Sequence, residues 1–225
     1  MQVVAEDAQG QTRYQFVLDH GVDPAVPLAR QGLRVLGPIE ATGSDADLTL
    51  RLRVADDPLI ARRLSSNGQS PTPRDDDVAA EAIPEPRQRI AAYAWVESDR
   101  GVLASEFARA TSPLRWGPPG GGIDPGEEPI AAVHREVMEE TSQVIELGDL
   151  IGINSRHWIG RNFSGRAEDF HAVQLVYRAW CPDPTDPVVL EVDGTTSAAT
   201  WFPRDRWREQ KWAPGWRILL GRLID

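Results

Sequence analysis

Three glutamates, Glu136, Glu139 and Glu140, crowd into five consecutive positions of one predicted helix. At about 100° per residue their carboxylates share one arc, and like charges at these spacings destabilise a helix by roughly 0.2–0.5 kcal/mol per pair. An apolar stripe on the neighbouring arc is expected to face a core: Ile130, Val133 and Val137. Carboxylate oxygens are the ligands that Mg²⁺ and Mn²⁺ prefer. The segment therefore predicts a divalent-cation site on a helix that packs against a core.

A glycine-rich loop precedes this helix. Residues 118–122 read Pro-Pro-Gly-Gly-Gly, and glycines allow sharp turns and a close approach of backbone to a ligand. Glu127 and Glu128 fall where the helix should begin, and Pro129 suits its first turn. The loop is thus expected to present backbone groups while the helix presents carboxylates.

Loop and helix together resemble the Nudix box. That pattern is Gly, five residues, Glu, seven residues, Arg-Glu, an aliphatic residue, one residue, Glu-Glu, one residue, Gly and an aliphatic residue. The matching positions are Gly121, Glu127, Arg135, Glu136, Val137, Glu139 and Glu140. The chain departs from the pattern at Ser142, which replaces Gly, and at Gln143, which replaces the aliphatic residue. Both lie in the turn that leaves the helix, where Gly normally supplies a left-handed cap.

The resemblance implies a fold, a reaction and roles for the residues. The fold is a Nudix-like α/β/α sandwich around a mixed sheet. The reaction is hydrolysis of a nucleoside diphosphate linked to another group, by water that Mg²⁺, or alternatively Mn²⁺, activates. The implied metal ligands are Glu139, Glu140, the Gly120 carbonyl and Glu136, with general base as the alternative role of Glu136. Arg135 would orient the acidic residues through an ion pair with Glu127, and Gly121 and Gly122 would contact the substrate.

Further candidates lie after the box. The family often draws another acidic ligand from a loop before the last strand, and Glu191 and Asp193 occupy that position, with Glu168 and Asp169 as alternatives. Trp158 is a candidate for stacking on a nucleotide base, although packing is the alternative for it and for Trp116 and Phe163. The last candidates, His157 and His171, would contact phosphate or form local hydrogen bonds.

Composition excludes several classes of partner. A net charge of −10 argues against a general nucleic-acid or anionic-membrane surface, because those partners require a basic face. The single cysteine, Cys181, excludes an intramolecular disulfide. The first residues lack the pattern of a signal peptide, and no apolar run has the length of a membrane span. A cytoplasmic protein is expected, and a homodimer is left open.

The chain divides into three predicted parts. Residues 64–87 are rich in Pro, Ser and Asp and predict a flexible linker. Residues 1–63 form a small β-containing region, because apolar residues alternate with polar ones over residues 48–54. Residues 88–225 form the Nudix domain, with strands expected at 90–96, 101–107, 147–154, 171–180 and 198–202. A terminal helix over 203–225 is expected to be interrupted by Pro214-Gly215.

Two classes of function fit the sequence. The first is a Nudix-type pyrophosphohydrolase acting on a nucleotide-derived substrate. The alternative is a catalytically silent Nudix-fold protein that senses a nucleotide or binds a partner, because residues 1–63 and the altered Ser142-Gln143 have no explanation in the enzyme. The residues that mark particular substrates in the family are not evident around Trp158, so the sequence leaves the substrate open.

Overall fold

The computed structural model describes residues 1–61, 74, 78, 84–109, 112–161, 165–190 and 194–224. The chain forms two compact units, which we treat separately. Unit 1 contains Met1–Ile90 and Ile153–Gln174, and unit 2 contains Ala91–Gly152 and Leu175–Asp225. The division into residues 1–63, 64–87 and 88–225 stays a prediction. Within the predicted linker, residues 85–87 belong to a strand, and most of the remainder lies outside the described residues.

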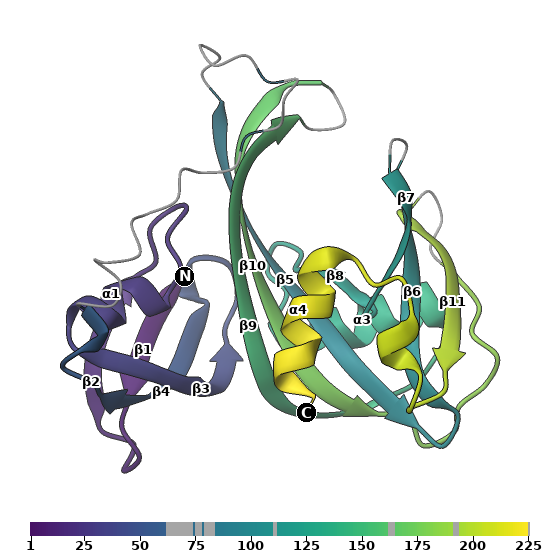
Figure 1. The fold of residues 1–225 in the computed structure, drawn as a ribbon, viewed down its shortest axis with the longest axis horizontal. Coiled ribbons are helices and arrows are strands. Elements are labelled where there is room, and N and C mark those ends of the chain that lie inside the picture. Colours follow the sequence, from purple (N-terminus) through teal and green to yellow (C-terminus); the bar gives the residue numbers. More distant parts are fainter. Residues whose placement is uncertain are drawn as a thin grey trace. The chain divides into compact units, whose positions relative to one another are not determined.

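Unit 1 contains a small mixed sheet with the strand order β2-β1-β4-β3 (Figure 1). Its strands are β1 (Gln2–Glu6), β2 (Thr12–Val17), β3 (Leu33–Thr42) and β4 (Thr49–Asp56). Strand β1 pairs with β4 in parallel and with β2 in antiparallel orientation, and β3 pairs antiparallel with β4. The described residues between β2 and β4 also form the short helices α1 (Ala25–Arg30) and η1 (Asp45–Asp47).

The alternation of apolar and polar residues over residues 48–54 corresponds to strand β4, as predicted. Its four apolar side chains are at most 2% exposed: Leu48, Leu50, Leu52 and Val54. Successive side chains of a strand point to opposite faces, so one face of β4 forms the core of the small sheet. The predicted β-containing N-terminal region is confirmed.

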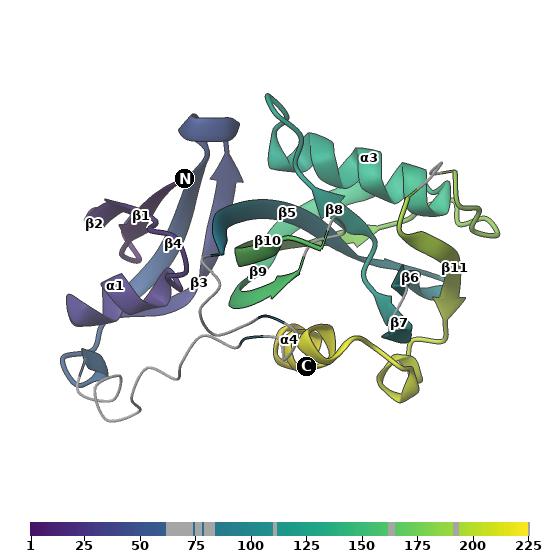
Figure 2. The ribbon, with the colours of Figure 1, turned by 90° about the horizontal axis from the view of Figure 1, so that it is seen from above.

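A second, seven-stranded sheet has the order β11-β6-β5-β10-β9, with β7 paired to β6 and β8 paired to β5. Its strands are β5 (Glu85–Ser98), β6 (Gly101–Arg109), β7 (Ser112–Gly117), β8 (Gly120–Gly122), β9 (Glu146–Arg161), β10 (Ala167–Trp180) and β11 (Thr196–Phe202). Strands β5, β9 and β10 contribute residues to both units. In unit 2, helices α3 (Pro129–Thr141) and α4 (Pro214–Leu223) lie on opposite faces of the sheet (Figure 2). This arrangement confirms the predicted α/β/α sandwich.

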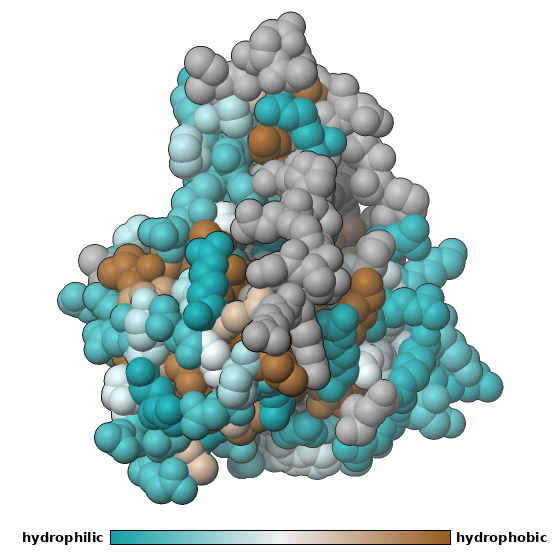
Figure 3. Space-filling view, turned by 60° about the vertical axis from the view of Figure 1, so that its left-hand side comes forward, coloured by the Kyte–Doolittle hydropathy of each residue, from teal (hydrophilic) through white to brown (hydrophobic). Residues whose placement is uncertain are grey.

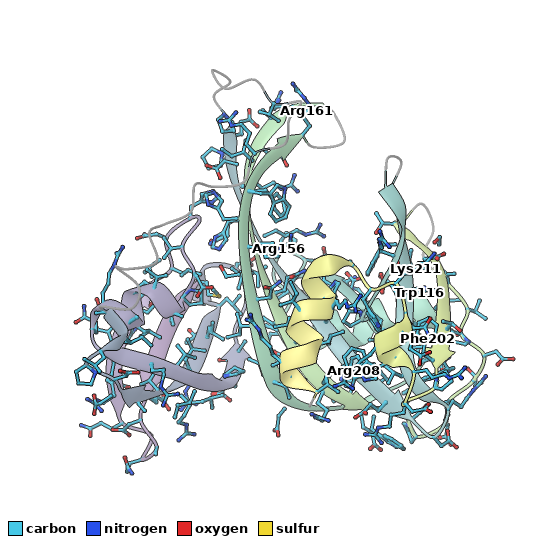
Figure 4. All side chains as sticks on the ribbon, in the orientation of Figure 1. Trp116, Arg156, Arg161, Phe202, Arg208 and Lys211 are labelled. Atoms are coloured by element: carbon cyan, nitrogen blue, oxygen red, sulfur yellow. The ribbon has the colours of Figure 1, made fainter. Side chains whose placement is uncertain are left out.

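Tryptophans build the core between the sheet and α4. Four are at most 7% exposed: Trp95, Trp207, Trp212 and Trp216. The rings of Trp95 and Trp207 meet edge to face at 5.0 Å, and the rings of Trp116 and Phe202 pack at the same centroid distance (Figure 4). Truncating one buried tryptophan typically costs about 3–5 kcal/mol. The aromatic residues of the C-terminal segment therefore serve packing.

The terminal helix differs from its prediction. Pro214 occupies the first turn of α4 instead of interrupting a longer helix, and residues 207–209 form the separate short helix η2 (Trp207–Glu209). Proline suits the first helical turn because its missing N–H would be unpaired there in any case. The Pro214-Gly215 pair thus marks the beginning of α4.

The face of the molecule drawn in Figure 3 is mostly polar. On the face drawn in Figure 3, hydrophilic residues cover most of the described area and hydrophobic residues form separate small patches. Scattered exposed apolar residues are ordinary for a globular protein. None of the described helices has the length and apolar character needed to cross a membrane.

Candidate active site

Helix α3 and the glycine loop before it form the site in unit 2. The helix begins at Pro129, after Glu128 in an extended conformation. It ends at Ser142, whose φ of 57° and ψ of 20° lie in the left-handed region. The backbone N–H of Ser142 donates to the carbonyl of Met138 at 2.9 Å. Ser142 therefore supplies the left-handed cap for which glycine was expected.

The three glutamates of α3 differ sharply in exposure. Glu140 is 3% exposed, the Glu136 side chain 12% and the Glu139 side chain 42%. The helical angle explains this order, because Glu140 lies only about 20° from the buried Val133 whereas Glu136 and Glu139 lie about 60° and 120° away. Glu140 thus belongs to the buried stripe.

The predicted apolar stripe is only partly correct. Val133 and Val137 are fully buried, but Ile130 is 47% exposed. Ile130 is the second residue of the helix, so the angular position that buries Val137 two turns later does not bury it. Pro129 and Ala132 occupy the buried side of this first turn instead.

Arg135 connects the acidic residues around the helix start. Its Nε and Nη2 atoms donate to the two carboxylate oxygens of Glu127, both at 2.9 Å. Its Nη1 donates to Glu136 at 2.9 Å and to Glu139 at 3.1 Å, and Nη2 also donates to the Gly122 carbonyl at 3.1 Å. These hydrogen bonds hold the pKa of Glu127 below its ordinary value. The predicted Arg135–Glu127 ion pair is confirmed, and one guanidinium positions three carboxylates.

Glu140 is a buried carboxylate. It accepts hydrogen bonds from the Gly120 backbone N–H at 3.0 Å and from the Thr196 hydroxyl at 2.5 Å. Burial, the largest cause, raises the pKa of Glu140 to about 7, although both hydrogen bonds act to lower it. In the part of the chain that the structure describes, no Lys or Arg forms an ion pair with it. A cation at this carboxylate would relieve the penalty of burying its charge.

The glycines of β8 leave room for these groups. Gly120 has a φ of 143°, and a side chain there would collide with the backbone of Ala92 and Tyr93. A Cβ at Gly121 would lie 2.5 Å from Oε1 of Glu136, so the glycine loop and the helix carboxylate are in direct contact. The absence of side chains at both positions is thus a packing requirement of the site.

The two departures from the box pattern fix a neighbouring loop. The Ser142 hydroxyl accepts a hydrogen bond from the Val188 N–H at 3.1 Å. The amide of Gln143, only 2% exposed, donates to the Thr185 hydroxyl at 2.8 Å and accepts from the Thr185 N–H at 2.9 Å. The Leu190 N–H donates to the Glu139 carbonyl at 2.7 Å. Residues 185–190 are thereby held against the end of α3.

The other predicted site residues lie elsewhere or outside the described residues. Glu191, Asp193 and Phe163 fall among the residues that the structure does not describe. Trp158 belongs to unit 1, where its ring packs against Phe170 at 4.7 Å and carries the Arg156 guanidinium at 5.7 Å. Its proposed contact with substrate stays a prediction.

The remaining acidic and histidine candidates engage one another or nearby residues. In unit 1, Glu168 forms an ion pair with Arg87 at 3.3 Å, and Asp169 contacts His157. Sequence reasoning missed Thr196 as a partner of Glu140, because the two residues lie 56 positions apart and a lone threonine carries no signal. It also missed the way in which Asp169 and His157 come together with His20.

Comparisons with known proteins match the region of the chain that contains this site. The family model described as the NUDIX domain matches residues 87–220. An RNA pyrophosphohydrolase of Mesorhizobium japonicum is 44% identical over 78 residues, covering 32% of this chain and 44% of that protein. The diphosphoinositol polyphosphate phosphohydrolase 3-alpha of Mus musculus is 39% identical over 70 residues, covering 31% and 43%.

Two further matches cover more of the other protein. The nucleoside triphosphatase NudI of Salmonella typhimurium is 30% identical over 95 residues, covering 40% of this chain and 67% of that protein. A solved MutT protein of Methanosarcina mazei aligns with a TM-score of 0.48 at 18% identity, over 64% of this chain and 96% of that one. The chain spans less than half the length of the first two curated relatives.

The match over residues 87–220 covers more than half of the chain and includes the whole acidic helix with its glycine loop. The protein therefore belongs to the Nudix family, and the predicted membership is confirmed. The match begins at the first residues of β5 and ends within α4, so the family domain takes in the seven-stranded sheet and both of its covering helices.

Proposed function

We propose that the protein is a Nudix hydrolase that cleaves a diphosphate linkage in a nucleotide-derived substrate with metal-activated water. The observation that carries the proposal is the set of three glutamates of α3, of which two are held by Arg135 and the third is buried beside the glycine loop. The three curated relatives have different substrates in their names, but each name describes hydrolysis of a phosphate compound. The proposal accordingly names the linkage and the nucleotide-derived class, and no individual substrate.

The donor set fits a hard divalent cation. Carboxylate and carbonyl oxygens suit Mg²⁺ or Mn²⁺, and Glu140 is a buried carboxylate of raised pKa to which a cation would be the natural counter-charge. We assign the ligands to Glu139, Glu140 and the Gly120 carbonyl, with Glu136 as a further ligand or, alternatively, as the general base. A bound cation would lower the pKa of a coordinated water and offset the charge of the diphosphate oxygens.

The chain's own residues have distinct tasks in this scheme. Arg135 holds Glu136 and Glu139 on the same side of α3 and fixes them to Glu127. Glu136, which lies against Gly121, would accept a proton from the attacking water if it is the general base and not a ligand. Gly121 and Gly122 offer backbone to the diphosphate, Trp158 remains a candidate for stacking on the base, and Glu191 or Asp193 remains a candidate for a further ligand.

The alternative of a silent nucleotide sensor loses one of its supports. Ser142 takes the left-handed conformation expected of glycine, and Gln143 is satisfied by Thr185. The altered end of the box therefore does not distort α3. The remaining support is the unexplained N-terminal region.

A hydrolysis screen tests the proposal. The full chain is incubated with nucleoside triphosphates, nucleotide sugars, ADP-ribose and dinucleoside polyphosphates, with Mg²⁺, with Mn²⁺ and with EDTA. We expect cleavage of at least one class at the diphosphate, and complete loss of turnover in EDTA that added Mg²⁺ reverses. Tight nucleotide binding without turnover under any metal condition would favour the sensor instead.

Gly121→Ala should reduce hydrolysis with little effect on folding. The new methyl group would lie about 2.5 Å from the Glu136 carboxylate and displace it. A misplacement of about 1 Å can reduce a rate up to about 100-fold. The backbone at Gly121 has no positive φ, and the new methyl group would meet only the end of the Glu136 side chain, which can shift at the cost of its hydrogen bond to Arg135. The unfolding free energy should therefore fall by only about 1 kcal/mol.

A second glycine provides the matched control. A Cβ at Gly221, in α4, meets no atom within 4 Å. Gly221→Ala should keep full activity and stabilise the helix by up to about 1 kcal/mol. Measurement of kcat and of the thermal midpoint for both variants separates the two effects. Equal activity of Gly121→Ala and wild type would contradict the assigned contact with Glu136.

A further inference from the structure

Unit 1 brings three of the protein's four histidines together with one aspartate. His20 lies in the loop between β2 and α1, His157 in β9, and Asp169 in β10. We call His20, His157 and Asp169 the histidine cluster. The third histidine, His171 of β10, lies beside it. The chain is otherwise poor in histidine, and the fourth, His134, is an exposed residue of α3.

The potential ligand atoms of the cluster converge. One side-chain atom from each residue lies within 4.8 Å of the other two. Nε2 of His20 is 3.0 Å from Oδ1 of Asp169, and Nε2 of His157 makes a close contact with the same oxygen. The three side chains are 30%, 24% and 24% exposed, so the cluster is partly sheltered and still open to solvent.

The backbone next to His20 is shaped for this convergence. Gly21 has a φ of 74°, and a Cβ there would lie 2.7 Å from Cε1 of His157. Only glycine is compatible with both the left-handed conformation and the closeness of the ring. The His20 and His157 rings consequently meet edge to face with centroids 5.3 Å apart.

His171 supports the cluster without joining it. Its Nδ1 is 2.8 Å from Nε2 of Gln88, and its Nε2 is 2.9 Å from the Ser155 hydroxyl, so both ring nitrogens already have partners. Its ring packs edge to face on His20 and His157 at 5.7 Å and 6.2 Å. The hydrogen-bonded ring of His171 therefore helps to fix the orientation of both neighbours.

We propose that the histidine cluster binds one borderline transition-metal ion, with Zn²⁺ the best fit, through Nε2 of His20, Nε2 of His157 and the Asp169 carboxylate. Imidazole nitrogens with one carboxylate are the ligand types that Zn²⁺ accepts, whereas Mg²⁺ prefers oxygen alone. Zn–ligand bonds of about 2.0 Å in a tetrahedron separate two ligands by about 3.3 Å. The 3.0 Å between His20 and Asp169 is close to that separation. The fourth position would hold water, as the exposure of the cluster permits.

Such a site would act as a cross-link within unit 1. His20 and Asp169 are 149 residues apart in the sequence, and the ion would join the loop before α1 to strands β9 and β10. Closing a loop of that length gains stability because the unfolded chain loses freedom. The inference is independent of the proposed hydrolase function, which uses only residues of unit 2 for its ligands.

A Co²⁺ and Zn²⁺ titration of the untagged full chain tests the site. Excess Mg²⁺ is present throughout to saturate the carboxylates of α3. We expect one equivalent of Co²⁺ to bind with the visible absorption of nitrogen-ligated Co²⁺, one equivalent of Zn²⁺ to displace it, and the thermal midpoint to rise with Zn²⁺. Absence of this absorption in the wild-type protein would overturn the proposal, and the cluster would then be a hydrogen-bonded network only.

Variants assign the ligands. His20→Ala and Asp169→Asn should each weaken Zn²⁺ binding by about 100-fold or more, since even loss of a supporting residue around a metal typically reduces affinity 10–100-fold. His134→Ala and Glu139→Gln are the matched controls and should bind Zn²⁺ like the wild type. Circular dichroism checks that each variant is folded, and His157→Gln replaces any variant that is not. Retained affinity in folded His20→Ala would also overturn the assignment.

Discussion

Glu140→Gln is expected to stabilise the metal-free protein by about 2–3 kcal/mol at pH 8 and to change its stability little at pH 5. The folded protein raises the pKa of this carboxyl from 4.5 to about 7, chiefly through burial. The protonated form is therefore favoured by folding. Its contribution to stability is fully present below about pH 4.5 and is lost as the pH rises through 7, at about 1.4 kcal/mol per pH unit.

Glutamine imitates the protonated carboxyl at every pH. Its oxygen can accept from the Gly120 N–H as Glu140 does, and its amide can donate to the Thr196 hydroxyl. The substitution thus removes a buried charge while keeping both hydrogen bonds. This is why the expected gain grows with pH.

Urea denaturation in EDTA at pH 5 and pH 8 measures the effect. Comparing the variant with the wild type at each pH cancels the contribution of the net charge of −10, which both proteins carry almost equally. Glu139→Gln is the control: its side chain is 42% exposed and its charge is largely hydrated, so removing that charge should not stabilise the protein at pH 8. Equal stability of wild type and Glu140→Gln at pH 8 would show that the carboxylate is not strained by burial.

Added Mg²⁺ should make the wild type more stable than Glu140→Gln. If Glu140 is a ligand, Mg²⁺ stabilises the wild type and has far less effect on Glu140→Gln. The same variant should lose hydrolysis while remaining folded. Active sites commonly contain a residue that lowers the stability of the protein while the ligand is absent.

The chemistry of α3 could be predicted because it depends on local spacing. The fixed distances among Glu136, Glu139 and Glu140 and the preceding glycines follow from one helix and one loop. The burial of Glu140 could also have been predicted from the helical angle. Glu140 lies about 20° from the buried Val133, whereas Glu139 lies about 100° further around the helix. What spacing could not give is the hydrogen bond from Thr196, which depends on how β11 lies beside the helix.

Prediction of the strands was limited in the same way, because some of them depend on partners far away in the sequence. Alternation over 48–54 was long enough to predict β4, whereas β1 covers only five residues and pairs in parallel with a strand more than forty positions later. Its partner, not its own sequence, establishes it as a strand. The histidine cluster is the extreme case. Its members come from one loop and two strands, and although His157 and Asp169 were candidates individually, no local spacing connects them with His20.

Glu136→Gln is expected to reduce kcat by about 10²–10⁴-fold, the range that general-base catalysis contributes. Arg135 donates to Oε1 of Glu136 at 2.9 Å, and the side chain is only 12% exposed, so the carboxylate is held in one position beside Gly121. Glutamine has nearly the same size and can keep an oxygen toward Arg135. The variant should therefore fold normally, and the loss should be confined to turnover.

The dependence on Mg²⁺ separates the two roles open to Glu136. A general base that is removed lowers kcat at saturating Mg²⁺ and flattens the acidic limb of the pH–rate profile, while the Mg²⁺ concentration for half-maximal activity stays the same. A ligand that is removed raises that concentration, and excess Mg²⁺ restores part of the rate. Because Glu140 is buried and Glu139 is exposed, Glu139→Gln provides the reference for the loss of a ligand. Wild-type turnover of Glu136→Gln would exclude both roles and leave Glu139 and Glu140 as the functional carboxylates of the helix.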